Sequence, residues 1–238
     1  MPRPLRVVKL GPVVMPAAIA GLIAIIALAS IVGVATARQG WPQLLGNGLL
    51  SVAAVWRGQV WRLVTFALLE TSPVSLIFSC LMLYWFAGDL ARLWGARPML
   101  GLFFGLAAAT GALTCLIALS WTDLATRSFA GAGSVVNGLA IAWGLVFPKR
   151  EIRLFFVLRL TGRRLILVIL GVTVLFALFY GIADFVPELA AESLTLAWFG
   201  LMRPWRAVRR RQRLQLAARG EAWSFSRWYE RERRRRSK

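Results

Sequence analysis

The sequence predicts an all-α protein that crosses a membrane several times. Hydrophobic residues make up 58% of the 238 residues, and the mean hydropathy of +0.66 lies well outside the range of soluble domains. The apolar residues are gathered into long uncharged runs. Since one span takes about 20 residues, the length allows one compact bundle of about six helices with loops and a tail. We therefore expect a six-helix membrane domain over 1–204, with an interfacial first loop, and a basic cytoplasmic tail over 205–238.

The residue types that are missing exclude much familiar chemistry. The chain has no histidine, so imidazole serves neither as a base nor as a metal ligand. The two cysteines, Cys80 and Cys115, lie inside apolar segments and lack the spacing of metal ligands. We expect no metal and no cofactor.

The first span is expected between Leu10 and Ala37, after a short basic segment at Pro2–Lys9. The triplet Ala35–Ala37 is similar to the cleavage site of a secretory signal. The apolar run is about twice the length of a signal's apolar region, which favours a retained helix. The following segment, Gln39–Trp56, is uncharged but interrupted by proline and glycine, which indicates an interfacial or partly re-entrant loop.

Five further spans complete the predicted bundle. They are expected at Thr71–Gly95, Pro98–Ser120, Phe129–Pro148, Leu165–Ala183 and, most weakly, around Ser193–Met202. Glu188 and Glu192 restrict the last span, since charged residues belong at the membrane interface rather than mid-bilayer.

The fourth of these segments, FAGAGSVVNGLAIAWGLVFP, is rich in small residues. Gly131, Ser134, Gly138 and Ala142 fall near one face at helical spacing, and such seams let neighbouring helices approach closely in lipid. We assign Gly131, Gly138 and Ala142 to helix packing.

The distribution of basic residues predicts the orientation. In a six-span arrangement with both termini inside, 25 of the 29 Lys and Arg residues fall on the inner side. The expected location is the cell membrane, plasma or inner, with both termini in the cytoplasm. Trp61 and Arg62 then lie in an outer loop, where an aromatic and a charged side chain suit an interfacial anchor.

Three stretches together resemble the rhomboid intramembrane proteases. They are GQVWRLVTFALLE with its Trp61–Arg62 pair, GAGSVVNGL followed by FPKREIRLFF, and LAWFG near the end of the last span. The resemblance covers roughly Gly58–Gly200. It implies a six-helix fold in which a serine and a histidine meet between the fourth and sixth spans.

The residues that carry the family's chemistry are replaced in this chain. Gly133 stands where the resemblance places the nucleophilic serine, and Trp198 stands at the histidine. Glu70, Ser75 and Ser79 replace a His, a His and an Asn, of which the latter two help to hold the oxyanion in the family. Because Gly133 is small and Trp198 is large, we expect the Trp198 ring to pack over Gly133 and to fill the former pocket.

The resulting interpretation is an inactive rhomboid-like protein, a pseudoprotease that binds the transmembrane segments of client proteins for sequestration, quality control or escort. One alternative is an active intramembrane serine hydrolase that uses Ser134 with an unidentified base. Another is a small channel or carrier, which the scarcity of charge within the spans disfavours.

The tail is the second place where a partner is expected. From Arg203 onward it contains 14 basic residues, with aromatic residues between them. A polybasic segment next to an inner leaflet is typical of binding to anionic lipids. Nucleic acid is a less suitable partner, because no DNA- or RNA-binding motif is present.

Overall fold

Long apolar helices dominate the computed structural model, which describes residues 7–10, 13–154 and 158–200. The chain forms two compact units, Met1–Leu196 and Ala197–Lys238. Four helical segments of the first unit are long and apolar enough to cross a membrane: Ala17–Arg38, Pro73–Trp94, Ala96–Ile117 and Gly162–Tyr180. A shorter apolar helix, α9 (Gly133–Val146), lies among them, and another helix covers 186–200. The multi-pass helical character is confirmed, whereas the six-span count stays a prediction.

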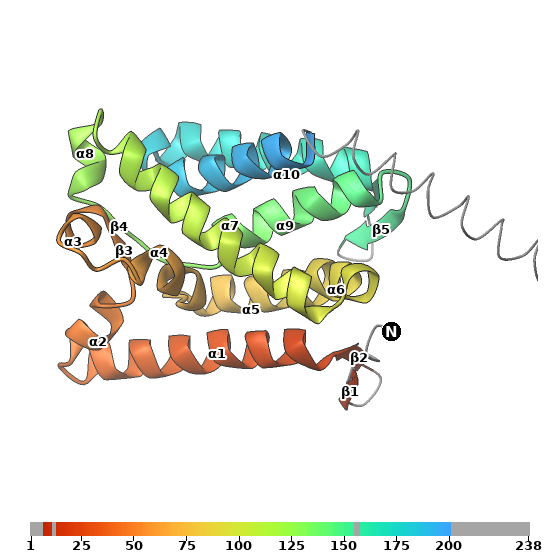
Figure 1. The fold of residues 1–238 in the computed structure, drawn as a ribbon, viewed down its shortest axis with the longest axis horizontal. Helices are drawn as coiled ribbons and strands as arrows, with labels where there is room; N and C mark the ends of the chain where they lie inside the picture. The colour runs from red at the N-terminus through yellow and green to blue at the C-terminus, as the bar shows by residue number, and fades with distance from the viewer. Residues whose placement is uncertain (1–6, 11–12, 155–157, 201–238) are drawn as a thin grey trace, which may run out of the picture. The chain divides into compact units, whose positions relative to one another are not determined.

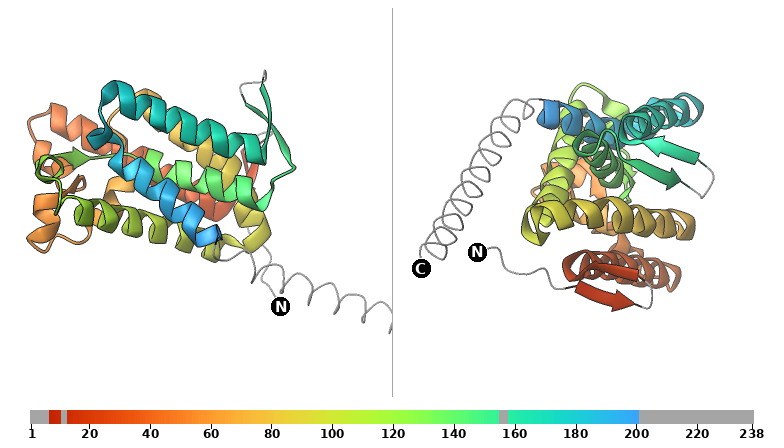
Figure 2. Two further views of the ribbon diagram at one scale, coloured as in Figure 1. Left: turned by 90° about the horizontal axis from the view of Figure 1, so that it is seen from above. Right: turned by 90° about the vertical axis from the view of Figure 1, so that its right-hand side faces the viewer.

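The long helices of the first unit run back and forth between two ends (Figure 1). One end carries the N-terminal strands, the turn between α6 (Gly88–Trp94) and α7 (Ala96–Ile117), and the strands β5 and β6. The other end carries the short elements that follow α1 (Ala17–Arg38). Viewed end-on, α1 lies on one side of the group and α10 (Gly162–Tyr180) lies on the opposite side (Figure 2).

Large apolar side chains remain exposed on these outer helices. Leu28 of α1 is 64% exposed, and Leu178 and Phe179 of α10 are 72% and 80% exposed. Side chains of this kind on the outside of an apolar helix are typical of a surface that faces lipid. This surface supports the membrane assignment made from composition.

The N-terminal end of the first span differs from the prediction. A hairpin of β1 (Val7–Leu10) and β2 (Val13–Pro16) precedes α1, which begins only at Ala17. The predicted start at Leu10 was wrong because hydropathy alone does not separate an apolar strand pair from the helix that follows. Pro16 fits the position just before the helix, where a missing N–H costs nothing.

The predicted interfacial loop contains short elements of its own: α2 (Pro42–Gly46), β3 (Leu50–Ser51) and α3 (Val52–Trp56). After it come α4 (Arg62–Thr65) and a 3-10 turn, η1 (Phe66–Leu68). The strand β3 pairs with β4 (Ser128–Phe129), which follows α8 (Thr122–Ala125). This pairing fixes the first loop against the segment that leads into α9.

The second span is interrupted by a wider turn. It consists of α5 (Pro73–Met82), the π-helical turn η2 (Leu83–Ala87) and α6. After α9 the chain forms a hairpin of β5 (Glu151–Leu154) and β6 (Leu158–Thr161). Another 3-10 turn, η3 (Ile182–Phe185), connects α10 to the helix over 186–200.

Close glycine contacts hold α9 in the bundle. A Cβ on Gly138 would lie 2.5 Å from Leu106 Cδ2 and 2.8 Å from Thr195 Oγ1, so any larger residue would displace these side chains. A Cβ on Gly144 would lie 2.5 Å from the carbonyl oxygen of Gly162 in α10. Gly138 thus lies close to α7 and the last helix, and Ala142 is buried at 1% exposure. The contact of Gly144 with α10 was not predicted.

Two predictions for this region are corrected. Gly131 does not lie on the helix, because α9 begins at Gly133 and Gly131 adopts a φ of +113° in the preceding turn. The last helix includes Glu188 and Glu192 rather than beginning after them. Glu192 is 1% exposed, so its side chain is enclosed by the protein. The boundary predicted after residue 204 and the tail itself lie outside the described residues.

Candidate functional site

A buried carboxyl group occupies the N-terminal end of α9. Glu70, in the loop before α5, is 4% exposed. Its Oε1 accepts hydrogen bonds from the Ser79 hydroxyl at 2.7 Å and from the Ala132 backbone N–H at 2.9 Å. Its Oε2 accepts a hydrogen bond from the Ser75 hydroxyl. Three donors from two separate parts of the chain therefore converge on one acidic side chain.

The backbone at Gly131 makes this convergence possible. The φ of +113° is a conformation that residues with a Cβ rarely adopt. A Cβ at this position would also lie 3.1 Å from Glu70 Oε2. The Gly131 N–H donates to the Phe66 carbonyl at 3.0 Å, which aligns the turn beside the Glu70 loop. Glycine is required here for conformation and for space.

The N-terminal end of α9 favours a negatively charged group at this position. Ala132 is the N-cap residue of α9, and the first N–H groups of a helix have no partner within the helix. These groups and the helix dipole attract anions. Glu70 supplies that negative group from within the chain.

The main chain of Glu70 is held by the first helix. Its N–H donates to the Ser30 hydroxyl oxygen at 2.8 Å, and that hydroxyl donates to the Ile26 carbonyl at 2.6 Å. Ser30 is buried at 2% exposure. The Glu70 loop is therefore fixed between α1 on one side and α9 on the other.

The structure brings together three of the positions that the sequence matched to the rhomboid active site, namely Ser75, Ser79 and Gly133. Ser75 and Ser79, matched to the oxyanion side, both bind Glu70. Gly133 follows directly after Ala132, so the position matched to the nucleophile borders the same cluster. The resemblance to the rhomboid proteases identified Glu70 only as a replaced residue. The signal that could have identified its role is an acidic residue at the end of the apolar run TFALLE, followed by two serines at helical spacing.

The other matched residues do not join the cluster. The Ser134 side chain is 2% exposed, and its hydroxyl oxygen has no hydrogen-bond partner in the described part of the chain. A Cβ on Gly133 would meet no atom within 4 Å, and the packing of the Trp198 ring over Gly133 stays a prediction. Trp198 belongs to the second unit, and its side chain is 57% exposed.

Arg62 has a different role from the one expected. It is 6% exposed, and its guanidinium donates to the carbonyls of Gly46 at 2.5 Å and Leu49 at 2.8 Å. Its Nε donates to Gln59 Oε1 at 2.6 Å. Arg62 thus organises the first loop from inside, while Trp61 is 52% exposed and remains available as an interfacial anchor.

A second polar cluster lies between α9, α10 and the last helix. Glu192 Oε1 accepts hydrogen bonds from the Thr173 hydroxyl at 2.5 Å and from Asn137 Nδ2 at 3.4 Å. The sequence analysis assigned no role to Thr173 or Asn137, because both lie far from Glu192 in the chain.

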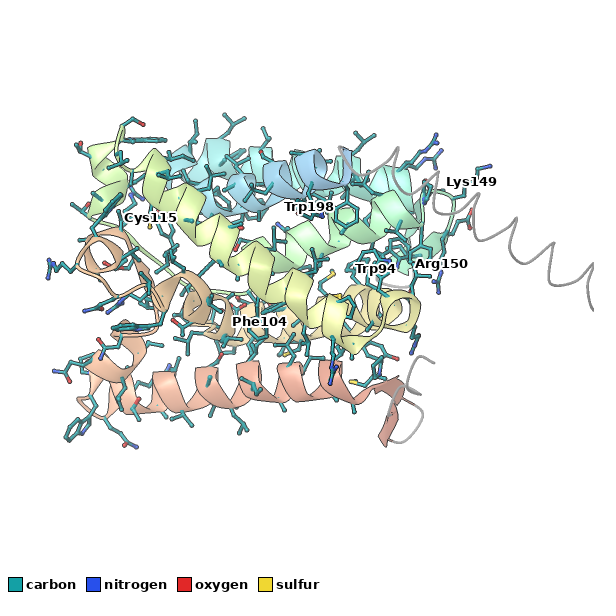
Figure 3. All side chains as sticks on the ribbon, in the orientation of Figure 1. Trp94, Phe104, Cys115, Lys149, Arg150 and Trp198 are labelled. Atoms are coloured by element: carbon teal, nitrogen blue, oxygen red, sulfur yellow. The ribbon has the colours of Figure 1, made fainter. Side chains whose placement is uncertain are left out.

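A third cluster closes the opposite end of α9. Trp143 is 1% exposed, and its indole N–H donates to Asp89 Oδ2 at 3.1 Å. Arg150 also pairs with Asp89 Oδ2 at 3.0 Å, and its guanidinium carbon lies 5.9 Å from the centroid of the Trp143 ring. Figure 3 shows Arg150 and Lys149 at the end of the bundle that carries β5. This cluster joins neighbouring segments and has the character of a structural contact.

The arrangement at Glu70 has a clear chemical consequence. The serine hydroxyls and the helix N-terminus are the kinds of donor that stabilise an oxyanion, but Glu70 already accepts hydrogen bonds from them. Within the described residues no group of three or more His, Cys, Asp or Glu side chains is placed to hold a metal ion. The cluster therefore has the features of a satisfied internal anion site.

The comparison with known proteins agrees with the membrane character of the chain. A search of the curated proteins gives no match. The model of one family matches residues 18–236, which is most of the chain. The match includes α1, the Glu70 cluster and the last helix. The chain belongs to the family described as eukaryotic integral membrane protein (DUF1751).

Proposed function

We propose that this chain is a catalytically inactive rhomboid-like membrane protein that binds the transmembrane helices of client proteins. The observation that carries the proposal is the Glu70 carboxyl group, which takes up the Ser75, Ser79 and Ala132 donors. This proposal rests on the sequence resemblance for the scaffold and on the cluster geometry for the loss of activity.

The loss of activity follows from the requirements of acyl hydrolysis. A serine hydrolase needs an activated hydroxyl and donors that are free to bind the developing oxyanion. Gly133 has no hydroxyl, and Glu70 competes for the donors beside it. The described contacts give Ser134 no hydrogen-bonded base, so they add no support to the hydrolase alternative.

The client class follows from the surface that remains. The outer faces of α1, α5 and α10 present large apolar side chains, among them Val74 at 77% and Ile77 at 69% exposure. In a membrane such faces accommodate lipid or another apolar helix. A scaffold without catalysis then acts by holding its client. We further propose a plasma or inner membrane location with cytoplasmic termini, and a polybasic tail that binds anionic lipids.

The test uses the purified full chain in liposomes with a panel of fluorescently labelled single transmembrane segments. We expect energy transfer to a subset of segments, with no transfer to a polyleucine control helix and no cleavage product. Transfer that is equal for every segment and for the control would contradict client binding. Cleavage, or covalent labelling of Ser134 by a fluorophosphonate, would contradict inactivity and favour the hydrolase.

A further inference from the structure

The last helix carries two carboxyl groups that share one unusual feature. Glu188 and Glu192 lie four residues apart, so they project from the same face one turn from each other. Oε2 of each is buried and has no hydrogen-bond partner among the described residues. A buried polar atom without a partner is costly, and here there are two on adjacent turns.

A third unpartnered group comes from a different helix. The Ser134 hydroxyl is buried at 2% exposure, also without a hydrogen-bond partner in the described ranges. Ser134 lies one turn before Gly138, where an added Cβ would lie 2.8 Å from Thr195 Oγ1 and 3.5 Å from the Ala191 carbonyl oxygen of the last helix. Because α9 and the last helix run in the same direction (Figure 1), Ser134 is level with the turn that carries Glu188.

In the described ranges, the charged side chains that act directly on Glu188 are all acidic. The charged groups that act on Glu188 are Glu192, Glu70 and Asp184. Of these, Asp184 is paired with Arg127, and Glu70 is bound by its own donors. Around Glu192, α10 contributes the Thr173 hydroxyl and α9 contributes the Asn137 amide, which are neutral. Two adjacent carboxylates in this setting repel each other and need a positive ligand.

We propose that Glu188 and Glu192 share one proton and form a proton-binding site inside the helix bundle. A proton on either Oε2 turns that oxygen into a donor for the other Oε2, so one ligand satisfies both unpartnered atoms. It also leaves one negative charge in place of two. The Ser134 hydroxyl completes the site as a further hydrogen-bonding group. The proton comes from water and returns to water, and the site is independent of client binding.

The site couples proton binding to the position of the last helix. With the proton bound, the pair joins its own helix to α9 and α10 through Asn137 and Thr173. Without it, two negative charges remain in the bundle interior. Near neutral pH the native state therefore keeps a proton that the glutamates of the unfolded chain have already released, so the free energy of unfolding falls as the pH rises toward the point where the site loses its proton.

The test is infrared difference spectroscopy on the full chain in lipid nanodiscs, with Glu188→Gln, Glu192→Gln and the exposed control Glu151→Gln. At pH 7 we expect the carbonyl band of a protonated carboxylic acid in the unmodified chain and in Glu151→Gln. The band is expected to be lost in each of the other two variants. In Glu188→Gln the amide N–H replaces the proton as donor to Glu192 Oε2, so this variant should remain folded.

Thermal unfolding gives a second measurement that does not depend on the band. The midpoint temperature of unfolding of the unmodified chain should decrease as the pH is raised from 6 to 9. The midpoint temperature of Glu188→Gln should decrease markedly less over the same range. Absence of the acid band from the unmodified chain, or its persistence in both variants, would overturn the proposal. Loss of the band in sodium chloride but not in choline chloride would also overturn it, because the ligand would then be sodium.

Discussion

The indole N–H of Trp143 donates a hydrogen bond to Oδ2 of Asp89 over 3.1 Å and thereby joins α9 to α6. Phe86 packs against the same ring, edge to face, at 5.5 Å between centroids. Replacing Trp143 with Phe removes the donor and leaves a gap in a fully buried site. We expect a loss of about 2–4 kcal/mol in the free energy of unfolding. Thermal unfolding in detergent measures this loss, with Trp121→Phe, at a half-exposed site, as the control. Equal stability of the two variants would contradict the assigned role.

Glu70 provides a prediction of a different kind, because its loss leaves several donors without an acceptor. Glu70→Ala should destabilise the chain by about 3 kcal/mol or more, since each abandoned buried donor costs ~1–3 kcal/mol. Glu70→Gln retains one acceptor oxygen and should cost less. Chemical unfolding followed by tryptophan fluorescence gives the values, and Glu151→Ala is the exposed control. A Glu70→Ala variant as stable as this control would show that the cluster contributes nothing.

Two glycines on neighbouring helices should respond oppositely to the same substitution. Gly144→Ala places a Cβ 2.5 Å from a backbone oxygen of α10, which cannot rotate away, so the helices must separate. We expect a cost of about 1–3 kcal/mol. Gly101→Ala in α7 meets nothing within 4 Å and should be neutral or slightly stabilising, because alanine favours a helix by ~1 kcal/mol over glycine. Unfolding midpoints of both variants check the difference, and a stable Gly144→Ala would refute the close approach.

The orientation can be checked by labelling single cysteines in a variant without Cys80 and Cys115. In sealed vesicles with the outer face exposed, an impermeant maleimide should label Arg57→Cys directly. Glu151→Cys in the hairpin should be labelled only after permeabilisation, because basic residues favour the inner side. Both residues are exposed, so accessibility within the protein does not confound the comparison. Direct labelling of Glu151→Cys would reverse the proposed topology.

The sequence was informative where the physical signal is local. Long uncharged runs located α5 to α7 and α10 to within a few residues, because a lipid-spanning helix must hide its backbone polar groups over a fixed length. The same signal misplaced the start of α1, since an apolar hairpin at 7–16 has the hydropathy of a helix. It also placed Gly131 on a helix that begins two residues later.

The polar clusters could not be predicted because their partners are distant in the chain. Nothing near Glu70 indicates that the Ala132 N–H will reach it, and nothing near Glu192 indicates Thr173 of the preceding helix. The rule that charged residues lie at the interface does not indicate that Glu192 is buried, because the bundle itself provides donors to its carboxyl group. Such a rule treats every span as surrounded by lipid, whereas a helix in a bundle has one face against protein.

The pairing of Leu50 with Phe129 bears on how the protein is made. All the elements from α3 to α8 lie between the two strands in the chain, so β3 has no partner until all of these have left the ribosome. During that interval Glu70 has Ser75 and Ser79 nearby but lacks the Ala132 N–H, which arrives only with α9. The first loop therefore completes its pairing only after α7 has been synthesised, and in a chain stalled before Phe129 the Glu70 carboxyl group would lack one of its three donors.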